Sequence, residues 1–181
     1  MAADTVAFLD TLNVGRSHLA GHSDGANVAL LIALTHPDLV DRLVLISGNF
    51  HHDGLIPGLD LGELAANDFL AEAYGQISPD RRHHFPVVAA KIVAMAATGP
   101  TLSTADLARV AARTLVMAGD DDAVSAEHTL ELYRGIPDAE LAVIPGTSHA
   151  LIIEKPGLCN GIILDFLTTN PVATFMPIRR A

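Results

Sequence analysis

The sequence predicts a single α/β domain in which helices cover both faces of a doubly wound, mostly parallel sheet. Short apolar segments of strand type alternate with helical segments, and this alternation implies right-handed crossovers and parallel strand pairing. The segments 42–47 and 114–118 are almost continuously apolar, as expected for strands that are covered on both faces. Between them, residues 51–112 lack strand signals and show helical patterns, which indicates a helical insertion.

The composition favours a globular chain that acts on a small molecule. Half of the 181 residues are hydrophobic, which suffices for a substantial core. With 11 basic against 21 acidic residues, a nucleic-acid or anionic-membrane partner is disfavoured. No apolar run approaches the roughly 18 residues of a membrane span. Cys159 is the only cysteine, so an intrachain disulfide is excluded, and acidic residues stand where a signal peptide would be basic. We therefore expect a cytoplasmic location.

The first part of the chain is predicted to fold as helix, strand, helix and strand. Apolar residues at helical spacing predict a helix over 3–12, and an extended run follows at 17–20. The segment 26–35 is rich in alanine and leucine and predicts a helix that Pro37 ends. The apolar segment 42–47 is the second strand.

The remaining elements divide into an insertion and the second part of the core. The predicted helices and strands are a helix at 61–73, a helix at 87–97, a strand at 114–118, a helix at 126–133, a strand at 140–144 and a helix at 157–167. The core is therefore expected over 1–50 and 113–169 of the single domain 1–181, with a helical cap over about 51–112. The tail 170–181 contains two prolines and is expected to be irregular.

A glycine-flanked serine lies where the first strand meets the next helix. The segment GHSDG at 21–25 matches the G-x-S-x-G pattern, which in this context forms a turn that exposes a nucleophilic serine. Such a turn needs strained backbone angles, and the two glycines are expected to leave room for it. It would aim the backbone N–H of Asp24 at an oxyanion that develops next to Ser23. The alternative is that Ser23 only caps the helix.

Candidates for an acid and a base follow two later strands. Asp120, Asp121 and Asp122 come after the strand at 114–118, and His149 comes after the strand at 140–144. In a parallel sheet, ligands bind beyond the carboxyl ends of the strands. A serine needs a base within hydrogen-bond reach, and the base needs a third group to orient it. One aspartate can fill that role, while helix-capping and turn positions are the alternatives for the other two.

These segments resemble the α/β-hydrolase fold family, of the esterase, lipase and C–C hydrolase kind. The segments that carry the resemblance are GHSDGA (21–26), RLVLISG (42–48), TLVMAGDDDAV (114–124) and IPGTSHAL (144–151), and they span nearly all of the chain. The resemblance implies that the acid is the aspartate of a G-x-x-D pattern, which selects Asp122 after Gly119. It also implies that His149 is the base and that 51–112 is a cap that shapes the substrate pocket.

The chain departs from the family pattern at its beginning. Family members usually have several strands and a His-Gly loop before the nucleophile turn, and that loop supplies a second oxyanion N–H. Here the turn begins at residue 21 and no His-Gly dipeptide occurs, so we expect an N-terminally truncated fold. The segment 17–20 then becomes an exposed sheet edge, and we expect a homo-oligomer that covers it. A shortened gene product or a misassigned start codon is the alternative.

The combined expectation is a serine hydrolase without a cofactor, in which Ser23, His149 and Asp122 act together and the Asp24 N–H stabilises the oxyanion. The resemblance implies a small acyl substrate with an ester, lactone, thioester or activated C–C bond. One alternative is a non-catalytic ligand-binding or oligomer-forming remnant of this fold. The other is a cofactor-free perhydrolase or haloperoxidase with the same triad. The histidine pairs at 51–52 and 83–84 lack a zinc-type spacing, so no metal site is expected.

Overall fold

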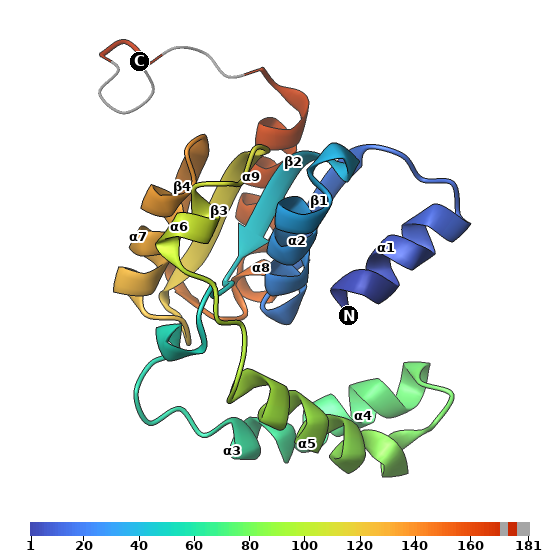
Figure 1. Cartoon of the computed structure of the whole chain (residues 1–181). Helices are drawn as coiled ribbons and strands as arrows, with labels where there is room; N and C mark the ends of the chain where they lie inside the picture. The colour runs from blue at the N-terminus through green and yellow to red at the C-terminus, as the bar shows by residue number, and fades with distance from the viewer. Residues whose placement is uncertain (171–173, 177–181) are drawn as a thin grey trace.

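A four-stranded parallel sheet forms the centre of the computed structural model, which describes residues 1–170 and 174–176, and only the backbone of 64 and 65 (Figure 1). Within these residues the strand order follows the chain order, β1-β2-β3-β4. The strands are β1 Ser17–His22, β2 Val40–Ile46, β3 Arg113–Asp121 and β4 Ala139–Ser148. The predicted parallel α/β architecture is confirmed.

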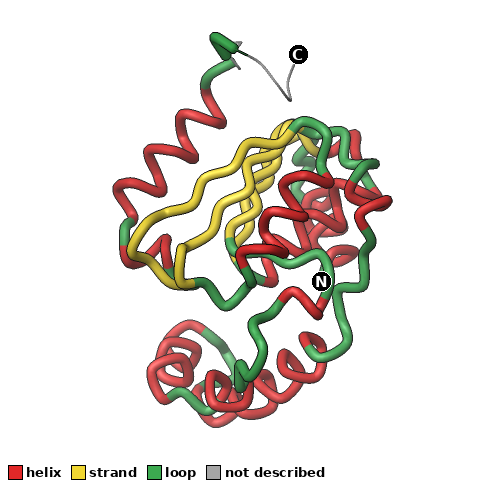
Figure 2. Tube along the Cα trace, turned by 90° about the vertical axis from the view of Figure 1, so that its left-hand side faces the viewer, coloured by secondary structure: helices red, strands yellow, loops and turns green. Residues whose placement is uncertain are grey.

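Helices cover both faces of the sheet (Figure 2). One hydrophobic cluster joins Leu43 and Leu45 of β2 to helices of the first face, and a second cluster joins Val44 and Ile46 to helices of the opposite face. The helices of the first face are α1 Ala2–Thr11, α2 Asp24–Thr35, α6 Thr104–Leu107 and α7 Ala126–Gly135, and those of the opposite face are α8 Leu151–Glu154 and α9 Pro156–Thr168. Because successive strand residues point to opposite faces, the continuous apolar run of β2 is buried on both.

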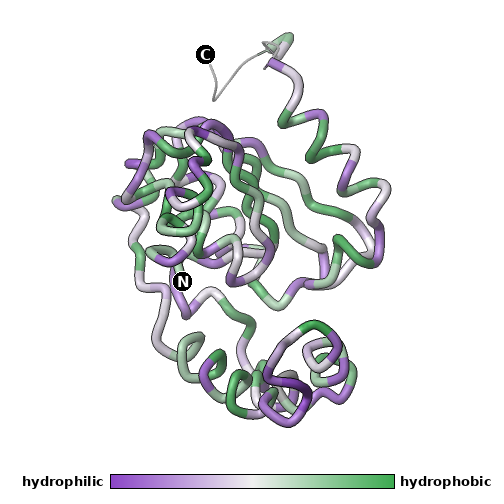
Figure 3. The backbone as a smooth tube through the Cα atoms, turned by 90° about the vertical axis from the view of Figure 1, so that its right-hand side faces the viewer, coloured by the Kyte–Doolittle hydropathy of each residue, from purple (hydrophilic) through white to green (hydrophobic). Residues whose placement is uncertain are grey.

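A helical cap is inserted between β2 and β3 and lies below the sheet in Figure 1. Its helices are α3 Leu61–Ala65, α4 Asp68–Ile77 and α5 Phe85–Ala96. They mix hydrophobic and hydrophilic residues, whereas the strands are mainly hydrophobic (Figure 3). Short 3-10 turns lie at η1 Pro37–Leu39, η2 His52–Gly54 and η3 Arg82–His84.

The prediction of a single helix over 61–73 is wrong, because the helical structure is interrupted between α3 and α4. The side-chain oxygen of Asn67 accepts hydrogen bonds from the N–H groups of Phe69 and Leu70. Asparagine is among the preferred residues at the N-cap, the position just before a helix, because its side chain accepts hydrogen bonds from N–H groups that the first helical turn leaves free. The helical spacing of the apolar residues continues across the break, so the sequence pattern did not indicate that Asn67 begins a new helix.

Other differences from the sequence expectation are short. Both β3 and β4 extend beyond the predicted bounds, since Asp121 still pairs with Ser148 after a bulge. The short helices α6 and α8 were not predicted, although α6 begins with a capping box formed by Ser103 and Asp106. The predicted irregular tail lies largely outside the described residues.

Strand β1 lies at the edge of the sheet, as expected, and in the described part of the chain it pairs with β2 alone. The side chains of His18 and Ala20 are exposed there. The homo-oligomer expected to cover this edge stays a prediction. Among the residues that the structure describes, no helix is both long and apolar enough to cross a bilayer.

Candidate active site

Ser23 occupies a strained turn between β1 and α2. Its backbone angles are φ 56° and ψ −123°, in a region that residues with side chains rarely adopt. The Ser23 N–H donates to the carbonyl of Ile46 at 2.8 Å, and the Ser23 carbonyl accepts from the N–H of Ala26 at 2.9 Å. The turn is therefore fixed to the end of β2 and to α2, and the strain predicted from the G-x-S-x-G pattern is confirmed.

The two glycines of this turn have different roles. A methyl group on Gly21 would lie 2.1 Å from the carbonyl oxygen of Gly25, whereas a methyl group on Gly25 would meet nothing within 4 Å. The close approach thus depends on Gly21, and the expectation that both glycines leave room for it is wrong for Gly25. The backbone of Gly25 is the surface against which Gly21 packs.

This difference predicts unequal effects of two alanine substitutions on stability. Gly21→Ala forces the backbone of Gly25 to move, and we expect a loss of about 2 kcal/mol or more in the free energy of unfolding. Gly25→Ala lies in the first turn of α2, where alanine has the higher helix propensity, and should change stability by about 1 kcal/mol or less. Urea unfolding of both variants measures this, and equal destabilisation would contradict the asymmetry.

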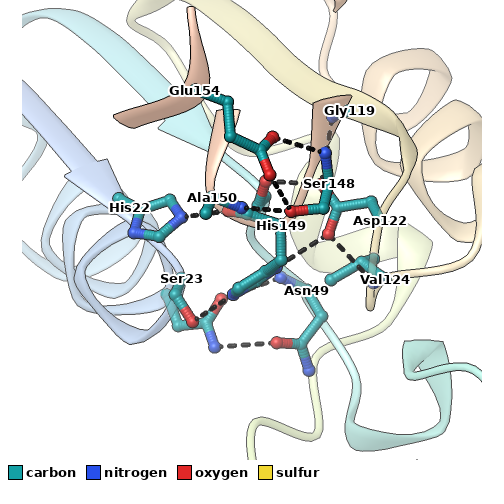
Figure 4. A network of polar contacts seen from close by, with 12 residues as sticks. His22, Ser23, Asn49, Gly119, Asp122, Val124, Ser148, His149, Ala150 and Glu154 are labelled. Carbon is teal, nitrogen blue, oxygen red and sulfur yellow. Dashed lines mark hydrogen bonds and ion pairs between the residues drawn. The ribbon is translucent and has the colours of Figure 1, made fainter. Parts of the chain in front are cut away.

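The three predicted triad residues lie together at the carboxyl ends of three strands (Figure 4). His149 Nε2 is 2.9 Å from Ser23 Oγ, and His149 Nδ1 is 2.7 Å from Asp122 Oδ1. The Asp122 side chain is only 2% exposed, while that of His149 is 34% exposed. Both distances are within the reach required for proton transfer and for orientation of an imidazole.

Four hydrogen-bond donors surround the Asp122 carboxylate. Besides His149, Ser47 Oγ donates to Oδ2 at 2.5 Å, the Gly119 N–H donates to Oδ2 at 3.1 Å, and the Val124 N–H donates to Oδ1 at 3.2 Å. Burial by itself raises the pKa of Asp122, but these hydrogen bonds outweigh it and lower the pKa to about 2. The carboxylate is therefore ionised at neutral pH.

The charge on Asp122 determines the tautomer of His149. A carboxylate only accepts hydrogen bonds, so His149 Nδ1 carries the proton and donates it to Asp122. In the neutral ring this leaves Nε2 unprotonated, and Nε2 can accept the hydrogen bond of the Ser23 hydroxyl. The arrangement thus presents a base to the hydroxyl group of Ser23.

The structure separates Asp122 from its two neighbours. Asp120 Oδ1 accepts a hydrogen bond from the Thr147 N–H at 3.0 Å, and backbone hydrogen bonds from Gly146 and Thr147 lower the pKa of Asp120. Asp120 therefore ties the end of β3 to the end of β4, while Asp121 is exposed. Neither caps the next helix, because Ser125 fills that position in α7.

The residues Ser148–Ala150, here called the base loop, are held by contacts that the sequence did not predict. The Glu154 carboxylate accepts from the Ser148 N–H at 2.7 Å and from Ser148 Oγ at 2.8 Å. On the other side, His22 Nε2 lies 2.7 Å from the carbonyl oxygen of His149. The only sequence signals were a glutamate shortly after the base and a histidine inside the serine motif.

A buried pair of asparagine side chains connects α2, the helix that follows Ser23, to the start of the cap. Asn27 Nδ2 donates to Asn49 Oδ1 at 2.9 Å, and the Asn49 N–H donates back to Asn27 Oδ1 at 2.9 Å. Asn49 Nδ2 also donates to the carbonyl of His51 at 2.9 Å. These bonds fix the loop after β2, in which Ser47 reaches Asp122.

Asp24 has the position expected of an oxyanion donor. It is the first residue of α2, and N–H groups of a first helical turn lack intrahelical acceptors. The positive end of the helix favours negative charge at the same place. Burial raises the pKa of the Asp24 carboxyl, and the nearby His149 opposes that shift.

One cluster outside the triad has the atoms of a metal site. His51, His52 and Asp53 each offer a ligand atom, and these atoms lie within 4.8 Å of one another. His52 Nδ1 is 3.0 Å from Asp53 Oδ1, and His51 Nδ1 is 3.5 Å from Asp53 Oδ2. However, His51 Nδ1 already accepts the Asp53 N–H, and the Asp53 side chain is 78% exposed. Contacts between neighbouring residues of an exposed turn account for this geometry.

The cap contains an open, mainly apolar cavity of about 980 Å³. Its wall includes Ala71, Phe85, Ala89 and Val93, together with the charged residues Asp68 and Arg82. No triad residue lines this cavity. The cavity therefore belongs to the cap helices and not to the triad site.

Comparison with known proteins gives the same fold. A family model described as "Alpha/beta hydrolase family" matches residues 1–161. A protein from Agrobacterium fabrum, named "Putative carbamate hydrolase RutD", is 31% identical over an alignment of 190 residues, and the match covers 92% of this chain and 73% of that protein. A protein of the same name from Caulobacter sp. is 28% identical, and the match covers 93% of this chain and 71% of that protein.

A solved structure supports the assignment. A hydrolase from Pseudomonas aeruginosa PA01 matches with a TM-score of 0.68 at 27% identity, over 93% of this chain and 71% of that one. The residues matched by the family model, 1–161, include the turn at Ser23, the cap and the base loop. Because the family model covers most of the sequence, this chain belongs to the alpha/beta hydrolase family.

Proposed function

We propose that this chain is a serine hydrolase in which Ser23 attacks a carbonyl group, His149 transfers protons and Asp122 orients His149. The observation that carries the proposal is the continuous contact from Ser23 Oγ to His149 Nε2 at 2.9 Å and from His149 Nδ1 to Asp122 Oδ1 at 2.7 Å. A serine that only caps a helix needs neither contact. The ionised Asp122 favours the tautomer that the reaction requires.

The proposed reaction has two halves. In the first, Ser23 Oγ forms a bond to the carbonyl carbon while its proton moves to His149 Nε2. The Asp24 N–H and the positive end of α2 stabilise the resulting oxyanion. The tetrahedral intermediate then collapses, the bond to the leaving group breaks, and His149 gives the proton to that group.

In the second half, water releases the acyl group from Ser23. His149 takes a proton from the water as its oxygen attacks the acyl carbon. The second tetrahedral intermediate expels Ser23 Oγ, which recovers its proton from His149, and a carboxylic acid leaves. The side chains begin and end in the same protonation states, so no cofactor is needed.

The proposed substrates are small, mostly uncharged acyl compounds with an ester, lactone, thioester or activated C–C bond. Carbamates belong among the compounds to be tested, because the curated relatives carry that word in their names. The proposed partner is therefore a small molecule.

A fluorophosphonate probe tests this function directly. The probe reacts with a serine only when a base activates its hydroxyl group, so we expect one adduct per chain, located on Ser23 by peptide mass mapping. Ser23→Ala should remain unlabelled, and Ser17→Ala, a serine change at the other end of β1, should be labelled like the wild type. A folded wild-type chain that stays unlabelled would favour a non-catalytic remnant of the fold.

A further inference from the structure

His22 connects the nucleophile turn to the base loop. Its Nε2 atom lies 2.7 Å from the carbonyl oxygen of His149, and the two rings are tilted with centroids 5.0 Å apart. His22 is adjacent to Ser23 in sequence, so one turn carries both the nucleophile and a contact to the backbone of its base. Figure 4 shows His22 and Ser23 reaching the base loop from the same side.

The chemistry of this contact fixes its direction. A carbonyl oxygen only accepts hydrogen bonds, so His22 Nε2 carries a proton and donates it to His149. His22 is the last residue of β1 and is paired in register with Ile46 of β2. The donor, His22 Nε2, therefore belongs to a residue that the sheet holds in place. The acceptor, the carbonyl oxygen of His149, belongs to the base loop.

In the described part of the chain, the other hydrogen bonds to the base-loop backbone act on the neighbours of His149, since the Ala150 carbonyl accepts from the N–H groups of Ile153 and Glu154 at 2.8 and 3.1 Å. Asp122 holds the ring at Nδ1, and the contact at Nε2 is the one with Ser23 that the proposed reaction uses, so Asp122 by itself does not fix the distance from Nε2 to Ser23 Oγ. Glu154 anchors the base loop through Ser148, one residue before the base. The His149 side chain is 34% exposed, so its exposed part is not constrained by packing. The bond from His22 acts on the backbone of the base itself.

We propose that His22 is a positioning residue that keeps His149 Nε2 at attack distance from Ser23 Oγ. It does not touch the reacting atoms, and it acts through the backbone of His149. This inference rests on the proposed hydrolase function. It assigns a role to the variable residue before the serine, which the motif itself leaves open.

Two substitutions of similar length isolate the hydrogen bond. In His22→Gln the amide Nε2 can donate at about the same reach, and in His22→Met the same volume carries no donor. We expect His22→Met to lower kcat for p-nitrophenyl acetate about tenfold or more, because small displacements of a catalytic group are costly, with KM nearly unchanged. His22→Gln should keep most of the wild-type kcat. His18→Ala, a histidine change on the exposed part of β1, should leave kcat unchanged.

The same comparison in a His149→Ala background separates positioning from a general structural effect. A residue that acts through His149 has no further effect once the imidazole is gone, so His22→Met should leave the residual rate unaltered there. Equal kcat values for the Gln and Met variants, or a tenfold loss that persists without His149, would overturn the inference while the wild-type chain remains active. A wild-type chain without turnover or labelling would overturn the proposed function, and this inference with it.

Discussion

Ser23→Ala and His149→Ala are each expected to lower ester turnover by about four orders of magnitude or more. Without Ser23 no acyl intermediate forms, and without His149 no other residue that the structure describes is hydrogen-bonded to the Ser23 hydroxyl to accept its proton. The measurement is kcat/KM on a short-chain p-nitrophenyl ester. Ser17→Ala and His18→Ala are matched controls on β1, and both should retain wild-type turnover.

The double variant Ser23→Ala/His149→Ala provides a stricter test of the same prediction. Residues that act as one unit lose most of their joint effect when either is removed. The double variant should therefore be little slower than the single variants, and the remaining rate reflects binding and the oxyanion donor. If the loss of kcat/KM in the double variant equalled the product of the two single losses, Ser23 and His149 would contribute independently. That result would contradict the proposal that they act as one unit.

Asp122→Asn is the second substitution with a large expected effect, a loss of about four orders of magnitude in kcat. The amide of asparagine can donate to His149 Nδ1, which stabilises the tautomer with the proton on Nε2. That tautomer cannot accept the proton of Ser23. In that orientation the amide nitrogen would also face the Val124 N–H, which now bonds to Oδ1, while the amide oxygen would still accept from Ser47 Oγ and the Gly119 N–H.

The neighbouring aspartate supplies the control for this substitution. Asp121 is exposed, and Asp121→Asn makes the same chemical change one residue away, so its kcat should stay within about twofold of the wild type. Similar losses in both variants would indicate a general effect of charge in this acidic loop. A fully active Asp122→Asn would assign the orientation of His149 to another group.

Much of the fold follows from local patterns in the sequence. The nearly continuous apolar run at 42–47 identified β2, because a strand buried on both faces has few polar positions. Gly21 and Ser23 lie between a strand and a helix, and that order predicted the strained turn. The break before α4 was missed because one capping side chain at Asn67 interrupts an otherwise continuous helical periodicity.

The contacts around the candidate site were less predictable than its central residues. His22 and His149 are 127 residues apart, and Ser47 and Asp122 are 75 apart. No local propensity encodes such pairs, because they depend on how the strand ends meet across the sheet. The choice of Asp122 among three consecutive aspartates likewise rested on the resemblance to a family pattern, since local signals favoured none of them.

The most direct test of the proposed function is hydrolysis of short-chain p-nitrophenyl esters by the purified 181-residue chain, measured beside Ser23→Ala with the oligomeric state recorded on the same samples. A hydrolase that uses Ser23 as its nucleophile predicts turnover by the wild-type chain and its loss in the variant. Equal turnover by both proteins, or no turnover from a folded wild-type sample, would contradict it.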